Sequence, residues 1–231
     1  MSSEKPFEDE IAQLEAKLGV PTGLFLKLRD EDDWSFIIKT QALLETALSY
    51  IIQISLGREE LAGFIDSLNL NGRTGKLAMV SALNLMRPEH IRYLERLSKL
   101  RNNLAHKIEY ASFTLQGHLK SMNTGELNQF ILDSFAIELG DEFKITDGVR
   151  DGVMQSPRAI LWYGALYCLL EIYGKEKEAE TESLKAQLYE RFYKAYTPYF
   201  GRGTVPLKTL MMANAIRSYP GPGLLGEAVM E

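Results

Sequence analysis

Apolar residues recur along this chain mostly at the three- and four-residue spacing of helices, and strand-like alternation is scarce. The longest pattern covers residues 30–56, where one face is apolar at about 100° per residue. That face carries Phe36, Ile37, Thr40, Leu43, Leu44, Ala47, Leu48, Ile51 and Ile54. Gly57 follows at once, in the position of a glycine just past a helix end. These residues predict one long amphipathic helix.

A second stripe, with Tyr93, Leu97, Leu100 and Leu104, belongs to a helix that Pro88 opens. Shorter helical patterns cover residues 7–18, 58–68 and 76–86. After residue 118 the pattern predicts further helix, with separate helices at 157–173, 176–196 and 204–218 and Ser156 as a cap. Residues 140–157 contain Gly, Asp and Pro turn signals and are expected to form a linker or long loop.

These elements predict an all-α protein. Residues 1–148 are expected to form a helical bundle, and residues 149–231 a C-terminal helical extension packed on it or linked to it. The length of 231 residues is enough for one sizeable core.

Composition is that of an ordinary globular protein, with 45% hydrophobic and 25% charged residues. The net charge of −5 argues against a generally basic nucleic-acid binder but leaves room for a local basic patch. The single cysteine, Cys168, fits a reducing compartment and a small buried side chain. Neither a signal peptide nor a membrane-spanning run is recognisable, so a cytoplasmic protein without membrane contact is expected.

Two kinds of site are disfavoured. The segment Gly72–Lys76 lacks the first glycine, the Ser or Thr after lysine and the preceding strand of a nucleotide-binding P-loop. The three histidines have no zinc-site spacing, and Asp141, Asp147 and Asp151 do not have that of a calcium loop. We therefore expect no metal and no cofactor.

A basic stretch remains between Ile91 and Ile108, with a local charge of +4 from five cations against Glu95. The cations are Arg92, Arg96, Lys99, Arg101 and Lys107. Such a run is either the solvated face of a surface helix or a contact surface for a polyanion.

The same helix ends in Arg101-Asn102-Asn103-Leu104-Ala105-His106. Arginine binds phosphate with a permanent charge, and histidine transfers protons near neutral pH. In a continuous helix Arg101 lies about 50° from the buried stripe, at the core margin, and His106 about 140° around the axis from Arg101. A shared site therefore needs either a helix break near Asn103 or a second chain.

The motif Arg101-Asn102-x-x-x-His106 resembles the Arg-x4–6-His motif of the HEPN superfamily, and Gln41–Ile52, an apolar helix with embedded Glu45, resembles its other signature. The likeness covers roughly residues 30–135. Thr74 to His106 also resembles the mannitol-operon repressor family, through a small-residue helix, a short loop and the Arg-Asn-x-x-Ala-His ending. Ala105 departs from those HEPN nucleases that have tyrosine before the histidine.

The HEPN resemblance implies a homodimeric, metal-independent endoribonuclease, such as a toxin or defence effector with an antitoxin partner. RNA would be cut to 2′,3′-cyclic phosphate and 5′-hydroxyl ends. His106 would move the proton and Arg101 would stabilise charge on the phosphate oxygens, while Asn102 would orient His106 or the phosphate. Glu45 would hold Arg101 or be only a surface carboxylate, while Arg92, Arg96, Lys99 and Lys107 would bind RNA.

Two other functions stay open. The repressor resemblance implies a non-enzymatic transcriptional regulator that acts through protein partners, because no helix-turn-helix is evident. The third hypothesis is a helical interaction module whose function lies in residues 159–218.

Overall fold

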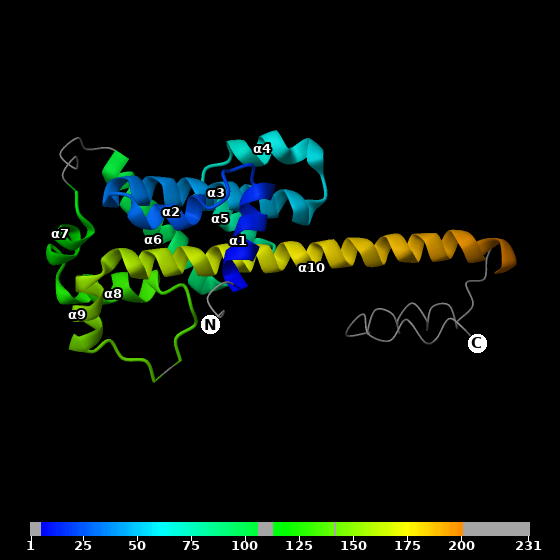
Figure 1. Ribbon diagram of the computed structural model, residues 1–231. Coiled ribbons are helices and arrows are strands. Elements are labelled where there is room, and N and C mark those ends of the chain that lie inside the picture. Colours follow the sequence, from blue (N-terminus) through cyan, green and yellow to red (C-terminus); the bar gives the residue numbers. More distant parts are fainter. Residues whose placement is uncertain (1–5, 106–112, 141, 201–231) are drawn as a thin grey trace. The chain divides into compact units, whose positions relative to one another are not determined.

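A computed structural model describes residues 6–105, 113–140 and 142–200 of the chain (Figure 1). These residues form helices joined by turns and contain no strand, which confirms the all-α prediction. The elements are α1 (Pro6–Lys17), α2 (Leu24–Lys27), η1 (Leu28–Asp30), α3 (Asp33–Leu56), η2 (Glu59–Leu61), α4 (Ala62–Ser67), α5 (Lys76–Ala82), α6 (Pro88–Ala105), α7 (Leu115–Lys120), α8 (Thr124–Ser134), α9 (Asp147–Gln155) and α10 (Pro157–Phe200).

Helix α3 is the long amphipathic helix that the pattern predicted, although it begins at Asp33 and not at residue 30. The Asp32 side chain caps it by accepting a hydrogen bond from the Ser35 N–H at 2.9 Å. Gly57 ends it in the left-handed conformation, with φ of 59°, as predicted. Its predicted apolar face is buried from Phe36 to Ile51.

Helices α3, α6 and the first half of α10 lie side by side (Figure 1), and two hydrogen bonds connect α10 to the other two helices. The Tyr93 hydroxyl on α6 donates to the Leu161 carbonyl oxygen on α10 at 2.6 Å. The Tyr50 hydroxyl on α3 donates to Glu176 Oε1 on α10 at 2.7 Å. Each contact satisfies a polar group that would otherwise cost free energy on burial. The three helices therefore pack in one hydrophobic core.

Two expectations for the second half of the chain were wrong. The segment 140–157 contains helix α9, which begins where the Thr146 hydroxyl accepts a hydrogen bond from the Val149 N–H at 3.3 Å. Gly148 and Gly152 tolerate helical geometry even though they suggested a loop. In addition, α10 continues through residues 173–176, where two separate helices were expected.

The chain divides into two compact units, Met1–Ala179 and Glu180–Glu231. The described core residues run from Ile11 to Ile172, so they all belong to the first unit. That unit includes residues 149–179, which the sequence pattern grouped with a C-terminal extension. Cys168 is fully buried within it, as predicted.

Candidate functional site

The predicted site residues belong mainly to α6, whose apolar stripe is confirmed. Tyr93 and Leu97 are completely buried, and Leu100 and Leu104 almost so. Leu94 and Ser98 are also buried, so the covered face is wider than the four-residue stripe. This packing holds the other face of α6, with Arg92, Glu95 and Lys99, toward solvent.

Arg101 lies exposed near the C-terminal end of α6. Its Nη1 atom donates to the side-chain oxygen of Asn102 at 3.2 Å, and no carboxylate within the described residues pairs with it. The expected position of Arg101 at the margin of the core was therefore wrong: its side chain is exposed, although Leu100 and Leu104 on the same part of α6 are buried. His106 and Lys107 lie outside the described residues.

Glu45, predicted either to hold Arg101 or to be only a helix-face carboxylate, is one-third exposed on α3 and accepts from the Lys76 ammonium at 3.2 Å. Lys76 is almost fully buried, and its Nζ atom also reaches the carbonyl oxygen of Asp66 at 3.3 Å. An ammonium without a partner in this position would be costly. Lys76, the lysine of the P-loop-like segment Gly72–Lys76, is therefore the buried ion-pair partner of Glu45.

The predicted RNA-binding cations differ in their surroundings. Arg96 forms an ion pair with Asp133 on α8, at 2.5 Å and 3.1 Å, and lies over the Phe130 ring. Arg92 and Lys99 are exposed and make no ion pair within the described part of the chain. The local charge on the described part of α6 is therefore smaller than the sequence count suggested, because Asp133 offsets one cation.

A cleft of about 560 Å³ lies between the 69–76 turn, α5 and α6. Lys99 and Glu95 line one side, and Leu77 and Ile91 give it an apolar part. The Asn71 amide donates to the Ser98 hydroxyl at 2.6 Å and ties the turn to α6. This cleft lies on the same side of α6 as Arg92, whereas Arg101 points about 200° around the helix from Lys99.

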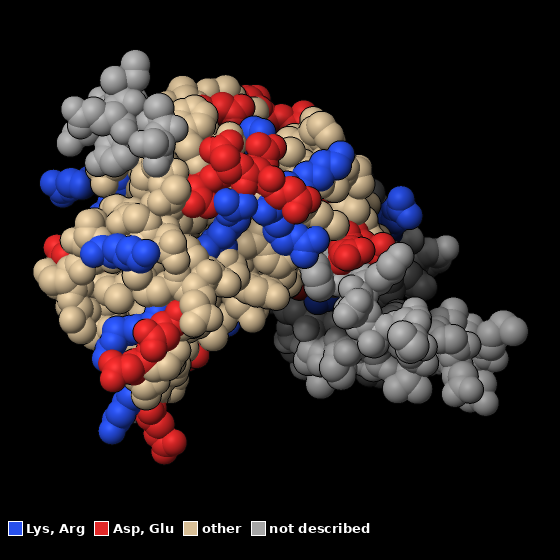
Figure 2. Space-filling view, turned by 60° about the vertical axis from the view of Figure 1, so that its left-hand side comes forward, with Lys and Arg blue, Asp and Glu red and all other residues tan. Residues whose placement is uncertain are grey.

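Figure 2 shows that acidic and basic side chains adjoin one another over the middle of one face of the molecule. That face therefore has no wide field of one sign. Opposite charges only a few ångströms apart produce fields that largely cancel at longer range, so a distant polyanion responds only to the net charge. Contact with RNA would depend on individual exposed cations and not on a broad basic surface.

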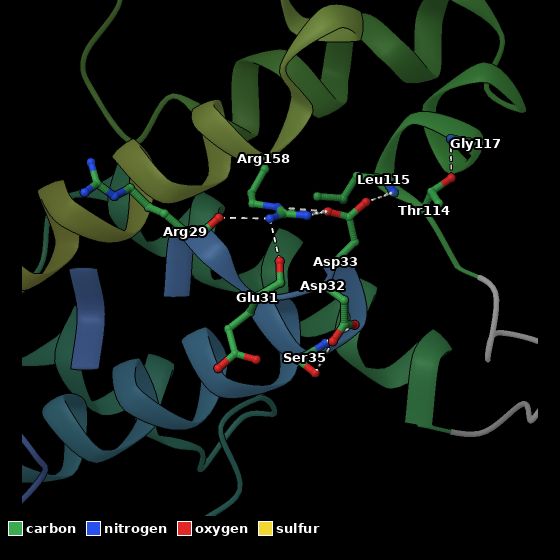
Figure 3. Close-up of polar contacts among 9 residues, drawn as sticks. All are labelled: Arg29, Glu31, Asp32, Asp33, Ser35, Thr114, Leu115, Gly117 and Arg158. Carbon is green, nitrogen blue, oxygen red and sulfur yellow. Dashed lines mark hydrogen bonds and ion pairs between the residues drawn. The ribbon is translucent and has the colours of Figure 1, made fainter. Parts of the chain in front are cut away.

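A second polar cluster, which the sequence did not indicate, fixes the start of α10 (Figure 3). Arg158 donates to Asp33 Oδ1 from Nε at 2.9 Å and from Nη2 at 2.5 Å. Its Nη1 atom donates to the carbonyl oxygens of Arg29 at 2.9 Å and Glu31 at 2.5 Å. The other oxygen of Asp33 accepts from the Leu115 N–H at 2.8 Å. One arginine thus connects η1, α3 and α10, and its aspartate partner extends the link to α7.

Beside this cluster is a cleft of about 520 Å³. Its lining includes Arg29, Asp33, Gln116, Gln155, Arg158 and Tyr163. These residues come from five elements, so no spacing in the sequence could have grouped them. The only sequence signal was the aromatic pair Trp162-Tyr163 one turn after the Ser156-Pro157 helix start.

The fold lowers the pKa of two histidines, His90 and His118. His90 is completely buried, and its Nδ1 atom has no hydrogen-bond partner in the described structure. Burial lowers the pKa of His90 and Arg87 lowers it further, while Glu171 and Glu89 oppose the shift. Burial and nearby Arg96 lower the pKa of His118.

We expect the free energy of unfolding to fall as the pH drops from about 7.5 to 5.5. The folded-state pKa of His90 lies below the unfolded value of 6.5, so the unfolded chain takes up protons that the folded chain does not. The stabilisation is complete above pH 6.5 and is lost as the pH falls through the folded-state pKa. Urea unfolding of wild type and His90→Gln at both pH values measures this. His90 should contribute up to about 1.4 kcal/mol per pH unit to the slope of the unfolding free energy against pH, and His90→Gln should lack this contribution. An equal slope in the variant and wild type would contradict the role of His90.

Burial raises the pKa of the Cys168 thiol and of the Tyr93 hydroxyl well above their usual ranges. Both groups are therefore neutral at physiological pH, and Cys168 is not an activated nucleophile. No cluster of three or more metal-binding side chains occurs in the described residues. No described helix is both long and apolar enough to cross a bilayer.

Comparisons of this chain with protein-family models, with curated proteins and with solved structures give no match. The likeness to HEPN proteins and to the mannitol-operon repressor family therefore rests on the residues quoted above.

Proposed function

We propose that this protein is a metal-independent endoribonuclease whose active site combines Arg101 of one protomer with His106 of another. The observation that supports it best is the state of Arg101. Its guanidinium is exposed at a helix end and is not paired with a carboxylate in the described residues. A guanidinium in that state is available to bind a phosphate.

In the proposed reaction the RNA 2′-oxygen attacks the adjacent phosphorus and the bond from phosphorus to the 5′-oxygen breaks. His106 accepts the 2′-hydroxyl proton, and a proton is delivered to the departing 5′-oxygen. Arg101 stabilises the charge that develops on the phosphate oxygens. The products are a 2′,3′-cyclic phosphate and a 5′-hydroxyl. A second protomer is part of the proposal because an unbroken helix would hold positions 101 and 106 about 140° apart around its axis.

The test is cleavage of end-labelled RNA by the full chain in excess EDTA. Wild type should cut, and Arg101→Ala and His106→Ala should each lose about 100-fold or more in rate. Arg58→Ala removes an exposed arginine outside the motif and should cut like wild type. Thermal melting has to show that all variants are folded. Intact RNA with wild type, or equal cutting by Arg101→Ala, would refute the proposal.

A mixing experiment tests the composite site. If each site takes Arg101 from one chain and His106 from the other, a mixed dimer of Arg101→Ala and His106→Ala contains one intact site. Random pairing would then restore about a quarter of wild-type activity. A site formed within one chain would give no restoration.

The second candidate is a non-enzymatic regulator that acts through a protein partner. It is favoured by the ion pairs of Arg96 with Asp133 and of Glu45 with Lys76, which occupy two predicted RNA-site residues. RNA that stays intact in every assay, together with recovery of a transcription factor or transporter component on immobilised protein, would support this function.

A further inference from the structure

We propose that the cleft beside the start of α10 binds a small molecule carrying an oxyanion, a carboxylate or a phosphate, on a planar ring. The cleft has a volume of about 520 Å³, within the usual range for small-molecule sites. None of the residues that line it lies on α6, and none is proposed to act in RNA cleavage. The inference is therefore independent of that function.

The walls of the cleft are preorganised. Four N–H groups of Arg158 are engaged by Asp33 and by the carbonyl oxygens of Arg29 and Glu31. The Leu115 N–H holds the second Asp33 oxygen (Figure 3). With four of its five N–H donors occupied, Arg158 acts as a structural connector and not as the main ligand group. A rigid wall lowers the entropy that a ligand loses on binding.

Arg29 supplies the available positive charge. Its guanidinium lies over the Trp162 ring, with Cζ 5.3 Å from the ring centroid. Figure 3 shows it directed away from Asp33, and no carboxylate among the described residues forms an ion pair with it. The Arg29 Nε atom donates to the Leu26 carbonyl oxygen at 3.4 Å, so the edge formed by Nη1 and Nη2 is the one that can bind an oxyanion in two places at once.

Tyr163 supplies a flat surface. Its side chain is 54% exposed although it stands edge-on to Trp162, with ring centroids 5.2 Å apart. Trp162 itself is not available, because Phe25 is stacked on it at 4.8 Å and Arg29 lies over its ring. A planar ligand would therefore stack on Tyr163 with its anionic group toward Arg29.

Amide groups complete the chemistry. The Gln116 side-chain nitrogen donates to the Met154 carbonyl oxygen at 3.3 Å, and Gln155 also lines the cleft. Neutral amides add hydrogen bonds without cancelling the charge on Arg29. Because the carboxylate of Asp33 is already occupied by Arg158, the cleft favours an anion over a cation.

The experiment titrates full-length Trp34→Phe protein with adenosine monophosphate, benzoate and inorganic phosphate. The chain has two tryptophans, so Trp162 alone reports in this background, and calorimetry gives the affinities. We expect saturable binding of at least one aromatic probe, tighter than that of inorganic phosphate. Preference for the monophosphate or for benzoate identifies the kind of oxyanion.

Arg29→Gln and Tyr163→Ala should each weaken binding about tenfold or more, because each removes one of the two recognition groups. Lys27→Gln removes an exposed cation two residues away that does not line the cleft, and it should bind like wild type. The proposal is overturned if neither aromatic probe saturates, if Arg29→Gln binds as tightly as wild type, or if inorganic phosphate binds as tightly as the aromatic probes.

Discussion

Gly164→Ala is expected to lower the free energy of unfolding by about 3 kcal/mol, because α6 and α8 leave no room for a Cβ atom on α10 at this glycine. A Cβ atom on Gly164 would lie 2.6 Å from Cδ2 of Tyr93 and 2.7 Å from the carbonyl oxygen of Ser134. Both distances are below any normal contact. Tyr93 is fully buried and its hydroxyl is bonded to the Leu161 carbonyl oxygen, so its ring cannot swing aside. The helices would have to separate.

Gly174→Ala is the matched control in the same helix. Gly174 is exposed, and a Cβ atom there would have nothing within 4 Å. Alanine should raise the free energy of unfolding by about 0.5–1 kcal/mol, because it loses less backbone entropy on forming helix. Thermal unfolding should show Gly164→Ala melting roughly 6–12 °C lower and Gly174→Ala slightly higher. Equal melting of Gly164→Ala and wild type would contradict the close approach.

Helices whose apolar face repeats regularly could be predicted from the sequence. The stripes that include Phe36 and Tyr93 did predict α3 and α6, and Gly57 and Pro88 marked one end of each. Where local signals competed, the prediction failed. The pattern predicted separate helices at 157–173 and 176–196, but burial of Ile172 and Glu176 on the same helix keeps α10 continuous.

Partners far apart in the sequence could not be predicted. Arg96 and Asp133 are 37 residues apart. The residues that line the cleft beside the start of α10 likewise come from separate elements. Helical geometry from the sequence placed Arg101 at the margin of the core, but it gave no information on which neighbouring elements cover that margin. Exposure of Arg101 follows from that tertiary arrangement, so only a structure could reveal it.

Loss of the Glu45 carboxylate is expected to destabilise the fold through Lys76. The Lys76 side chain is 4% exposed and that of Glu45 34%, with 3.2 Å between Nζ and Oε1. Removing one partner of a buried ion pair leaves an uncompensated charge. Because Glu45 is about one-third exposed and water screens the pair, Glu45→Ala should cost about 1–3 kcal/mol.

The double variant Glu45→Ala/Lys76→Met separates a structural role of Glu45 from a catalytic one. Methionine keeps an unbranched apolar chain in the buried position and removes the charge, so the double variant should recover most of the lost stability. Urea unfolding measures this, and a double variant no more stable than Glu45→Ala would contradict the buried-charge argument. If wild type cleaves RNA, the double variant should cleave it too, because Glu45 contacts Lys76 and not Arg101. A double variant that is stable but does not cleave RNA would instead indicate a catalytic role for Glu45.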